Sequence, residues 1–274
     1  MKVMIAGLGL IGGSMAKSLV RSGIKVDGFD RDNVIDYALK NNIIENKVND
    51  FSKYDLVFIA LPPDATMNFI ENNTFKDNAI VSDICGVKGV VEKLVYSKPR
   101  NFKYVGCHPM AGKEVSGIEN STEKLFDNAN MIIIENENTN AEAVQTLTEL
   151  FTKMGFKLIK HCSADHHDRK IAYTSQLAHI VSNAYVKSPA GKNYVGFTGG
   201  SFQDMTRIAG VDEEVWTRLY MLNREKIEEE LSTLISNLQK YLEAFKNNDE
   251  PTLKQLLKEG RNEKARLDAE KPII

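Results

Sequence analysis

The chain has 274 residues, 42% hydrophobic and 26% charged, which is typical of a globular protein with one large or two medium domains. Its 35 lysines and arginines against 37 aspartates and glutamates give a net charge of −2, which excludes bulk attraction to nucleic acid or a membrane surface. Three scattered cysteines without a C-x-x-C pair argue against a disulfide framework or a zinc site and favour a reducing cytoplasm.

The first thirty residues follow the order of a dinucleotide-binding βαβ unit, namely strand, glycine loop, helix, strand and acid. After the apolar run 2–6 comes the loop that we expect to contact the cofactor: Gly7, Leu8, Gly9, Leu10, Ile11 and Gly12. Gly7 permits the tight turn, Gly9 lets a pyrophosphate approach the backbone, and Gly12 lets the helix pack closely. The helix N-terminus presents free N–H groups to the phosphates. Because the strand begins so early, we expect no signal peptide.

A second apolar run, 24–29, ends at Asp30, an acid in the position that the βαβ unit requires. The Asp30 carboxylate can accept both ribose hydroxyls of NAD, and its charge would repel the 2′-phosphate of NADP. Arg31 has the opposite tendency, because an arginine there can stack on adenine or bind a 2′-phosphate. The sequence therefore predicts an NAD-binding Rossmann domain and favours NAD over NADP.

Strands and helices continue to alternate as far as residue 162. We expect a buried strand at 55–61 that ends in two prolines, where a doubly wound sheet opens toward its cofactor, so Leu61 and Pro62 are predicted to contact it. Asp83, at the end of the strand expected at 79–83, is a further predicted cofactor contact. Three more strands are expected at 102–107, 131–134 and 156–159. Residues 1–162 are thus predicted to form an α/β domain with a doubly wound, mostly parallel sheet.

From residue 163 the periodicity is helical, which predicts an all-α domain over 163–274. Residues 223–246 carry apolar side chains at spacings of three and four: Ile227, Leu231, Leu234, Leu238, Tyr241 and Phe245. About 24 residues of helix span on the order of 36 Å, so part of this stripe meets a second subunit, or else all of it covers its own domain's core. A last helix is expected to begin at 249–251 and to break or end at Gly260. No apolar run approaches the roughly 18 residues of a membrane span.

Three side chains outside the glycine loop are candidates for chemistry. His108 follows the expected strand 102–107, where a neutral imidazole could accept a hydroxyl proton as hydride leaves the same carbon; the alternative is a histidine that caps a turn. His179 lies in an otherwise apolar helix and by itself is typical of a core histidine. Arg207 requires an anion, either Asp204 in a structural pair or a substrate carboxylate held by a bidentate fork.

Four residues near residue 163 form a possible metal-binding group: His161, His166, His167 and Asp168. Adjacent histidines rarely point at one ion, and the segment 163–165 has the form of a helix cap. The sequence therefore predicts no metal site, and the group is interpreted as the start of a helix.

Four segments, in this order, resemble the prephenate/arogenate dehydrogenase family, the oxidative enzymes of tyrosine biosynthesis. They are Gly-Leu-Gly-Leu-Ile-Gly-Gly-Ser at 7–14, Ser-Asp at 82–83 with Val-Lys-Gly at 87–89, His-Pro-Met-Ala-Gly at 108–112, and Asp-Met-Thr-Arg-Ile-Ala at 204–209. The resemblance covers residues 3 to about 225. It implies a Rossmann domain, a helical domain that forms a homodimer, and NAD-dependent oxidative decarboxylation of prephenate to 4-hydroxyphenylpyruvate.

The resemblance also implies roles for individual residues. His108 would bind the ring 4-hydroxyl and assist its deprotonation, and Arg207 would hold a substrate carboxylate. His179 would line the substrate pocket, with Glu114 and Trp216 at its border. Loss of carbon dioxide makes the ring aromatic and drives the reaction, so the protein need only orient the ring, accept one proton and fix the anionic ends.

The chain departs from the family's pattern at two places. Gly86 stands where the family commonly has a serine that hydrogen-bonds near the catalytic histidine, and a water or the Cys85 thiol is a candidate replacement. Residues 175–179 read Ser-Gln-Leu-Ala-His where the family often has Ser-His-Leu-Pro-His. We expect neither a fused chorismate mutase nor a C-terminal amino-acid-sensing domain, so any inhibition by tyrosine is expected at the active site.

Three alternatives stay open from the sequence. An arogenate-preferring dehydrogenase would give tyrosine directly. The β-hydroxyacid dehydrogenases share the N-terminal unit and a helical second domain, but they use a lysine there, and their motif does not match the segment around Arg207. A Rossmann-based NAD sensor or an inactive relative is the non-enzymatic alternative, which the glycine at position 86 suggests.

Overall fold

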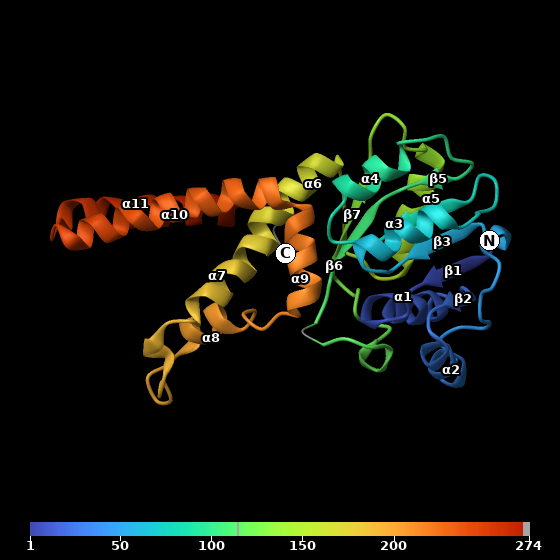
Figure 1. Ribbon diagram of the computed structural model, residues 1–274, viewed down its shortest axis with the longest axis horizontal. Coiled ribbons are helices and arrows are strands. Elements are labelled where there is room, and N and C mark those ends of the chain that lie inside the picture. The colour runs from blue at the N-terminus through green and yellow to red at the C-terminus, as the bar shows by residue number, and fades with distance from the viewer. Residues whose placement is uncertain (114, 271–274) are drawn as a thin grey trace. The chain divides into compact units, whose positions relative to one another are not determined.

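The computed structural model describes residues 1–113 and 115–270, and the chain divides into two compact units, Met1–Arg224 and Glu225–Ile274 (Figure 1). The first unit is built on an all-parallel sheet with the order β2-β1-β3-β4-β5. Its strands are β1 (Val3–Ala6), β2 (Val26–Phe29), β3 (Leu56–Ile59), β4 (Ile80–Asp83) and β5 (Lys103–Tyr104). Because β2 and β3 flank β1 on opposite sides, the chain changes direction there, and the crevice beyond β1 and β3 is where such sheets bind ligands.

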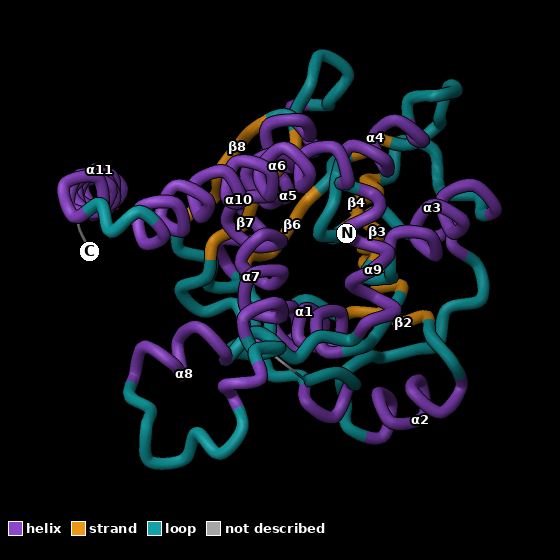
Figure 2. The backbone as a smooth tube through the Cα atoms, turned by 60° about the vertical axis from the view of Figure 1, so that its left-hand side comes forward, coloured by secondary structure: helices purple, strands orange, loops and turns teal. Residues whose placement is uncertain are grey.

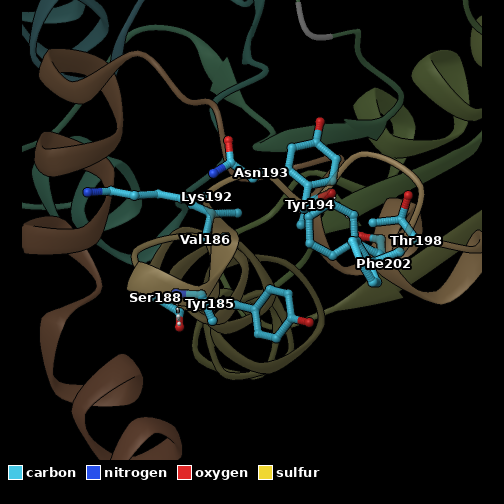
Figure 3. Close-up of a pocket in the computed structure, with 12 residues that line it drawn as sticks. Tyr185, Val186, Ser188, Lys192, Asn193, Tyr194, Thr198 and Phe202 are labelled. Atoms are coloured by element: carbon cyan, nitrogen blue, oxygen red, sulfur yellow. Dashed lines mark hydrogen bonds between the residues drawn. The ribbon is translucent and has the colours of Figure 1, made fainter.

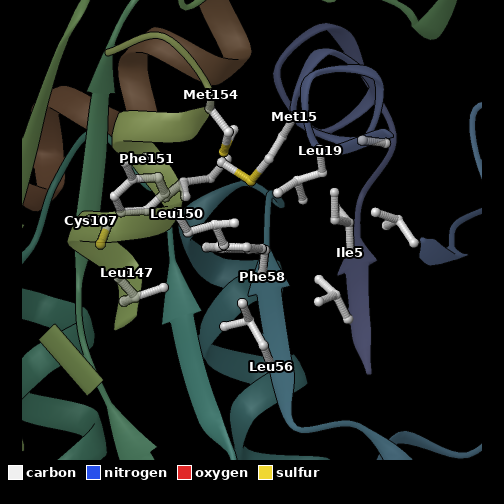
Figure 4. Packing of buried hydrophobic residues seen from close by; sticks show 14 of the residues in the cluster. Ile5, Met15, Leu19, Leu56, Phe58, Cys107, Leu147, Leu150, Phe151 and Met154 are labelled. Atoms are coloured by element: carbon white, nitrogen blue, oxygen red, sulfur yellow. The ribbon is translucent and has the colours of Figure 1, made fainter. Parts of the chain in front are cut away.

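Helices cover both faces of this sheet: α1 (Leu10–Arg21), α2 (Asp32–Lys40), α3 (Pro63–Asn72), α4 (Gly89–Val95) and α5 (Ala141–Lys153). Alternate residues of β3 serve two apolar clusters, because successive side chains of a strand point to opposite faces. Phe58 packs in a cluster with Met15 of α1 and Phe151 of α5 (Figure 4). Val57 lies in the other cluster, which Phe69 of α3 joins. Both faces are therefore buried, as the continuous apolar strands predict.

A second, three-stranded sheet follows, formed by β6 (Cys107–Met110), β7 (Asn130–Ile134) and β8 (Leu158–Cys162). The single strand expected at 102–107 is wrong, because the chain leaves the first sheet after Tyr104 and enters the second at Cys107. Val105 N still bonds Val81 O of the first sheet (3.1 Å), whereas Gly106 O already accepts from Ile134 N of the second (2.8 Å). The apolar run does not reveal this break, since the segments on both sides of it are buried. β6 runs antiparallel to β7, and β7 runs parallel to β8.

Only helices and turns follow β8 among the described residues, so the expected change from α/β to helical structure is confirmed (Figure 2). They are α6 (Ala164–Ile171), a π-helical turn (Ala172–Gln176), α7 (Leu177–Tyr185), α8 (Gly200–Thr206) and α9 (Glu213–Leu222). Short 3₁₀ turns lie at Phe51–Lys53, Ile118–Asn120 and Pro189–Gly191. The expected cap at Ser163 is present, since its hydroxyl accepts from the backbone N–H of His166 at 3.3 Å.

The second unit contains α10 (Arg224–Lys246) and α11 (Glu250–Ala269). Asp249 caps α11 by accepting from the backbone N–H of Thr252 at 3.0 Å. The expected break at Gly260 is wrong, because the helix continues to Ala269; a single glycine costs only about 1 kcal/mol in a helix that its neighbours favour. Two members of the apolar stripe of α10, Leu238 and Phe245, lie exposed, and so do Ile235 and Leu242 outside the stripe. In the described part of the chain, no helix combines the length and the apolar character that crossing a bilayer requires.

Candidate active site

The glycine loop between β1 and α1 has the geometry that its sequence predicts. Gly7 has φ +90°, and a Cβ there would lie 2.4 Å from the carbonyl oxygen of Ala60. A Cβ on Gly12 would lie 1.8 Å from the carbonyl oxygen of Gly7, so both positions require glycine. At Gly9 a Cβ would meet no heavy atom within 4 Å, and no side chain caps the start of α1. The N–H groups of the first turn, at Leu10 and Ile11, therefore face an open surface that fits a pyrophosphate.

Asp30 supports this loop from the end of β2. Its Oδ2 accepts from the backbone N–H of Leu8 at 2.6 Å, and its Oδ1 accepts from the N–H of Arg31 at 2.7 Å. Each carboxylate oxygen keeps a lone pair for a ribose hydroxyl. The Arg31 side chain is 83% exposed and reaches Asp30 only at 3.8 Å, so it is available to a ligand's adenine or phosphate as well.

Leu61 and Pro62 lie across the crevice from the loop, directly after β3. A Cβ on Gly7 would come within 2.9 Å of Leu61 Cδ2, which shows how closely the two chain segments approach. Pro62 precedes α3, whose first residue is Pro63. The predicted cofactor residues from β1, β2 and β3 thus gather at one edge of the sheet, and their contacts with NAD stay a prediction.

Asp83 has a different environment from the other predicted cofactor residues. It is fully buried at the end of β4, where it pairs with the equally buried ammonium group of Lys88. Its carboxylate also accepts from Tyr104 Oη at 2.6 Å and from the N–H of Cys85 at 3.0 Å, while Lys88 Nζ donates to Cys107 O at 2.7 Å. Burial, with the Asp83 charge acting in the same direction, raises the pKa of Tyr104 well above its ordinary value. The Asp83 side chain therefore joins β4 to β5 and β6, and its predicted cofactor contact stays untested.

His108 lies in β6 and is backed by a histidine and an aspartate from α6. Its Nδ1 is 2.9 Å from Nε2 of His167, and Nδ1 of His167 is 2.7 Å from Oδ1 of Asp168. Asp168 also accepts from the backbone N–H groups of Lys88 at 2.9 Å and Gly89 at 2.8 Å. Three side chains from two distant segments therefore form one hydrogen-bonded row.

Burial controls the charge state of this row. Burial, together with the nearby His167 and Lys88, holds the pKa of His108 well below its ordinary 6.5. Burial also lowers the pKa of His167, against the opposing effect of its bond to Asp168. Burial alone would raise the pKa of Asp168, but hydrogen bonds from His167 and the backbone outweigh it and lower that pKa. At neutral pH the row therefore consists of two neutral imidazoles and one carboxylate.

Sequence reasoning found His108 but missed the other two members of this row. It weighed His167 and Asp168 only as metal ligands, and within the described residues no cluster of three or more His, Cys, Asp or Glu has the arrangement of a metal site. The available signal was a histidine next to an acid at the start of a helix. Spacing along the chain does not say that this helix start faces β6.

Gly86 lies on the other side of the His108 ring, beside Nε2. A Cβ there would lie 3.7 Å from His108 Nε2 and 4.0 Å from Leu219 Cδ2, so Nε2 faces a region between Gly86 and α9. The Cys85 Sγ lies 3.3 Å from Thr66 Oγ1 and 3.5 Å from Leu61 O, and burial raises the pKa of this thiol to about 12. The thiol is committed to these partners, so the structure does not support it as the replacement for the family's serine.

Helix α9 connects this region with the predicted substrate residues. Arg218 forms a two-pronged ion pair with Asp64 at the start of α3, with Nη2 2.7 Å from Oδ1. Two residues before Arg218, the Trp216 ring packs on the His179 ring with a centroid separation of 4.0 Å. α9 thus contributes Leu219 beside Gly86 and Trp216 beside His179.

The segment that carries Arg207 is held on α7. His179 Nδ1 donates to Ile208 O at 3.0 Å, Ser182 Oγ donates to Met205 O at 2.7 Å, and Asn183 Nδ2 donates to Ala209 O at 3.1 Å. Arg207 itself is exposed at the end of α8. The structure therefore brings His179, Trp216 and the Arg207 segment together. The convergence of the Arg207 guanidinium with His108 stays a prediction, and Glu114 lies outside the described residues.

A cavity of about 710 Å³ lies elsewhere in the first unit, between the end of α7 and α8 (Figure 3). Its wall is mainly aromatic and apolar, with Tyr185, Tyr194 and Phe202 among the lining residues. Phe197 at its rim is 91% exposed. None of the predicted cofactor or substrate residues lines it.

Comparison with known proteins covers both halves of the chain. The family model described as prephenate dehydrogenase, nucleotide-binding domain, matches residues 15–160, and the one described as prephenate dehydrogenase, dimerization domain, matches 163–259. Prephenate dehydrogenase of Bacillus subtilis (strain 168) is 27% identical in an alignment 276 residues long. This alignment covers 95% of this chain and 74% of that protein.

Two solved structures are similar over nearly their whole length. Prephenate dehydrogenase of A. aeolicus, solved with hydroxyphenyl propionate and NAD⁺, matches with a TM-score of 0.85 and 27% identity, covering 97% of this chain and 98% of that one. Synechocystis arogenate dehydrogenase matches with a TM-score of 0.80 and 25% identity, covering 97% and 100%.

Proposed function

The chain belongs to the prephenate dehydrogenase family, and we propose that it catalyses the NAD-dependent oxidative decarboxylation of prephenate to 4-hydroxyphenylpyruvate in tyrosine biosynthesis. The observation that carries the proposal is the partly buried, neutral imidazole of His108, whose Nε2 lies beside Gly86, on the side of α9. A neutral imidazole is suited to take a proton from a ring hydroxyl near pH 7.

In this proposal the two edges of the crevice hold the cofactor. The loop Gly7–Gly12 and the first turn of α1 bind the pyrophosphate, Asp30 binds the adenosine ribose, and Leu61 and Pro62 flank the cofactor from β3. When bound, NAD supplies the acceptor for the hydride. Asp30 disfavours a 2′-phosphate by its charge, which supports NAD over NADP.

The substrate is held by residues of the helical half. Arg207 binds a substrate carboxylate, and His179 and Trp216, whose rings are in contact, border the pocket together with Glu114. His108 Nε2 accepts the proton of the ring 4-hydroxyl while hydride leaves the same carbon and the opposite carboxylate departs as carbon dioxide. Apart from this proton transfer, the residues need only orient the ring and hold its anionic ends, because aromatisation drives the reaction.

Formation of NADH at 340 nm tests the proposal directly. Purified protein is assayed with prephenate and with arogenate, each with NAD and with NADP. Turnover with prephenate and NAD supports the proposal, and turnover only with arogenate supports the second candidate, for which the similarity to Synechocystis arogenate dehydrogenase is the specific observation. Binding of NAD without turnover of either substrate would favour an NAD sensor or an inactive relative.

The same proposal includes a homodimer formed through the helical domain, residues 163–274, and a location in the cytoplasm. The match of a dimerization-domain model to 163–259 supports the dimer and the domain boundary after residue 162. So do exposed apolar side chains on this half, including Phe197 at 91% and Phe245 at 63%. The three unpaired cysteines support the cytoplasm. Light scattering at micromolar concentration measures the dimer, and a monomer of full activity would contradict it.

A further inference from the structure

We propose that His167 and Asp168 position His108 and determine which of its ring nitrogens accepts the substrate's proton. This inference rests on the proposed function, because it names two positioning residues for the same site. It follows from counting donors and acceptors along the row Asp168–His167–His108.

Asp168 is the first member of the row, and its hydrogen-bond donors include two backbone N–H groups. The N–H groups of Lys88 and Gly89 can only donate, and they point at Oδ1 and Oδ2 at 2.9 and 2.8 Å. The carboxylate therefore acts as an acceptor toward both. Nδ1 of His167, 2.7 Å from Oδ1, must carry a hydrogen, since a bare nitrogen would set its lone pair against that of the oxygen.

The hydrogen on Nδ1 determines the rest of the row. His167 is buried and neutral, so its Nε2 has a lone pair and accepts a hydrogen bond. Its partner is Nδ1 of His108 at 2.9 Å, which must then be the protonated nitrogen of that ring. The lone pair of His108 is left on Nε2, the nitrogen that faces the space beside Gly86. The backbone at the start of α4 thus sets the proton acceptor three groups away.

The row also prepares the site for the charge that His108 gains. An imidazolium formed by proton transfer to Nε2 keeps its Nδ1–H bond to His167, and the Asp168 carboxylate polarises His167 toward it. The other charged groups near the row include Lys88 and Asp83, which form a pair and largely offset one another, and Glu92, whose carboxyl interacts with that of Asp168. Asp168 is therefore the charge in the row that favours the protonated ring.

The hydrogen bond from His108 to His167 matters more with glycine at position 86 than it would with a side chain there that could also bond to His108. Since residue 86 has no side chain, the hydrogen bond that holds the His108 ring within the described residues is the one to His167. The ring's rotation about χ2 and its tautomer therefore depend on this contact.

Steady-state kinetics of His167→Asn test the inference, with His166→Asn as the matched control. His166 is the neighbouring histidine and is exposed, so its variant is expected to keep wild-type values. We expect His167→Asn to lower kcat about 10- to 100-fold and to leave the KM for NAD unchanged. We expect His167→Gln to recover part of this loss, because its amide oxygen can lie near the former Nε2 and accept from His108. Wild-type kcat in a folded His167→Asn protein would overturn the inference.

A double-mutant comparison separates positioning from general stability. In a His108→Asn background, adding His167→Asn is expected to change the residual turnover by less than about 2-fold, because the second residue acts through the first. A reduction as large as that in the wild-type background would show that His167 acts independently of His108, which contradicts the inference.

¹⁵N spectra of histidine-labelled wild-type protein give a readout that does not need activity. We expect His108, assigned by its loss in His108→Asn, to carry its hydrogen on Nδ1, and to become a mixture of tautomers in His167→Asn. A hydrogen on Nε2 in the wild type would refute the row even in an active enzyme. Failure of the proposed function is seen separately, as absence of NADH formation with both substrates by the wild type.

Discussion

The glycine loop provides a matched pair of substitutions whose effects the structure separates. A Cβ at Gly9 meets no heavy atom within 4 Å, and the residue has extended backbone with a negative φ (φ −70°, ψ −156°). Gly9→Ala should therefore fold about as well as the wild type, because the lower entropy of its unfolded chain offsets the cost of this ψ angle. The new methyl group occupies the surface where the pyrophosphate must approach. We expect NAD to bind about 10- to 100-fold more weakly, which corresponds to about 1.4–2.8 kcal/mol.

Gly12→Ala is the matched control, because its effect falls on the fold. Its Cβ would lie 1.8 Å from the carbonyl oxygen of Gly7, whereas real contacts of a Cβ essentially never fall below 3.0 Å. The backbone must move to remove this clash, and overpacking of this kind costs about 1–3 kcal/mol or more. We expect a lower thermal midpoint for Gly12→Ala in the absence of cofactor, in contrast to Gly9→Ala.

Isothermal titration with NAD and thermal unfolding without it measure the two effects separately. We expect an unchanged midpoint with weak NAD binding for Gly9→Ala, and a lowered midpoint for Gly12→Ala. A folded Gly9→Ala protein that binds NAD within about twofold of the wild type would show that the pyrophosphate does not lie against this face of the loop.

Four further outcomes are expected. His108→Asn should lower kcat about 10²- to 10⁴-fold, the usual contribution of a general base, with NAD affinity unchanged in titration; wild-type turnover would refute its role. Arg207→Ala should raise the KM for prephenate about 10- to 100-fold through loss of a charged hydrogen bond, whereas an equal loss of NAD affinity would contradict a carboxylate contact. Lys88→Met leaves Asp83 buried without its cation and should cost about 3–5 kcal/mol in urea unfolding. Because burial lowers the pKa of His108, the ring stays neutral at pH 7, so kcat/KM should hold its plateau there and fall only well below pH 6.5; a decline that begins above pH 7 would refute this.

The βαβ unit could be predicted from sequence because its constraints are local. Gly7 and Gly12 have no room for a Cβ, and Asp30 bonds to the loop that the glycines shape, so the chemistry and the spacing agree. The break between β5 and β6 could not be predicted, because residues 104–107, which span it, are all buried and include no charged residue or proline that would mark it. The continuation of α11 through Gly260 also escaped, since neighbouring helix formers outweigh one glycine.

The candidate site was predicted only in part, for a related reason. A residue type in a motif indicates what a side chain can do, as with His108, but it does not identify the partner across the fold. His167 lies 59 positions further along the chain, and its bond to His108 exists only because α6 packs near the end of β6. Asp83 differs again: its position at a strand end predicts a ligand contact, which stays a prediction, and its pairing with Lys88 inside the fold could not be read from that position.

Lys88, in the segment after β4, connects the buried Asp83 with the row that supports His108. Lys88 donates its ammonium hydrogens to Asp83 and to Cys107 O, next to His108, while its backbone N–H binds Asp168. One residue therefore fixes the end of β4, the strand that carries His108, and the carboxylate behind His167. β4 adjoins β3, whose own end borders the cofactor crevice, so the proton acceptor is tied to the sheet edge where hydride would be received. The position of His108 relative to that sheet edge then depends on buried contacts within the first unit, and these contacts form without a substrate.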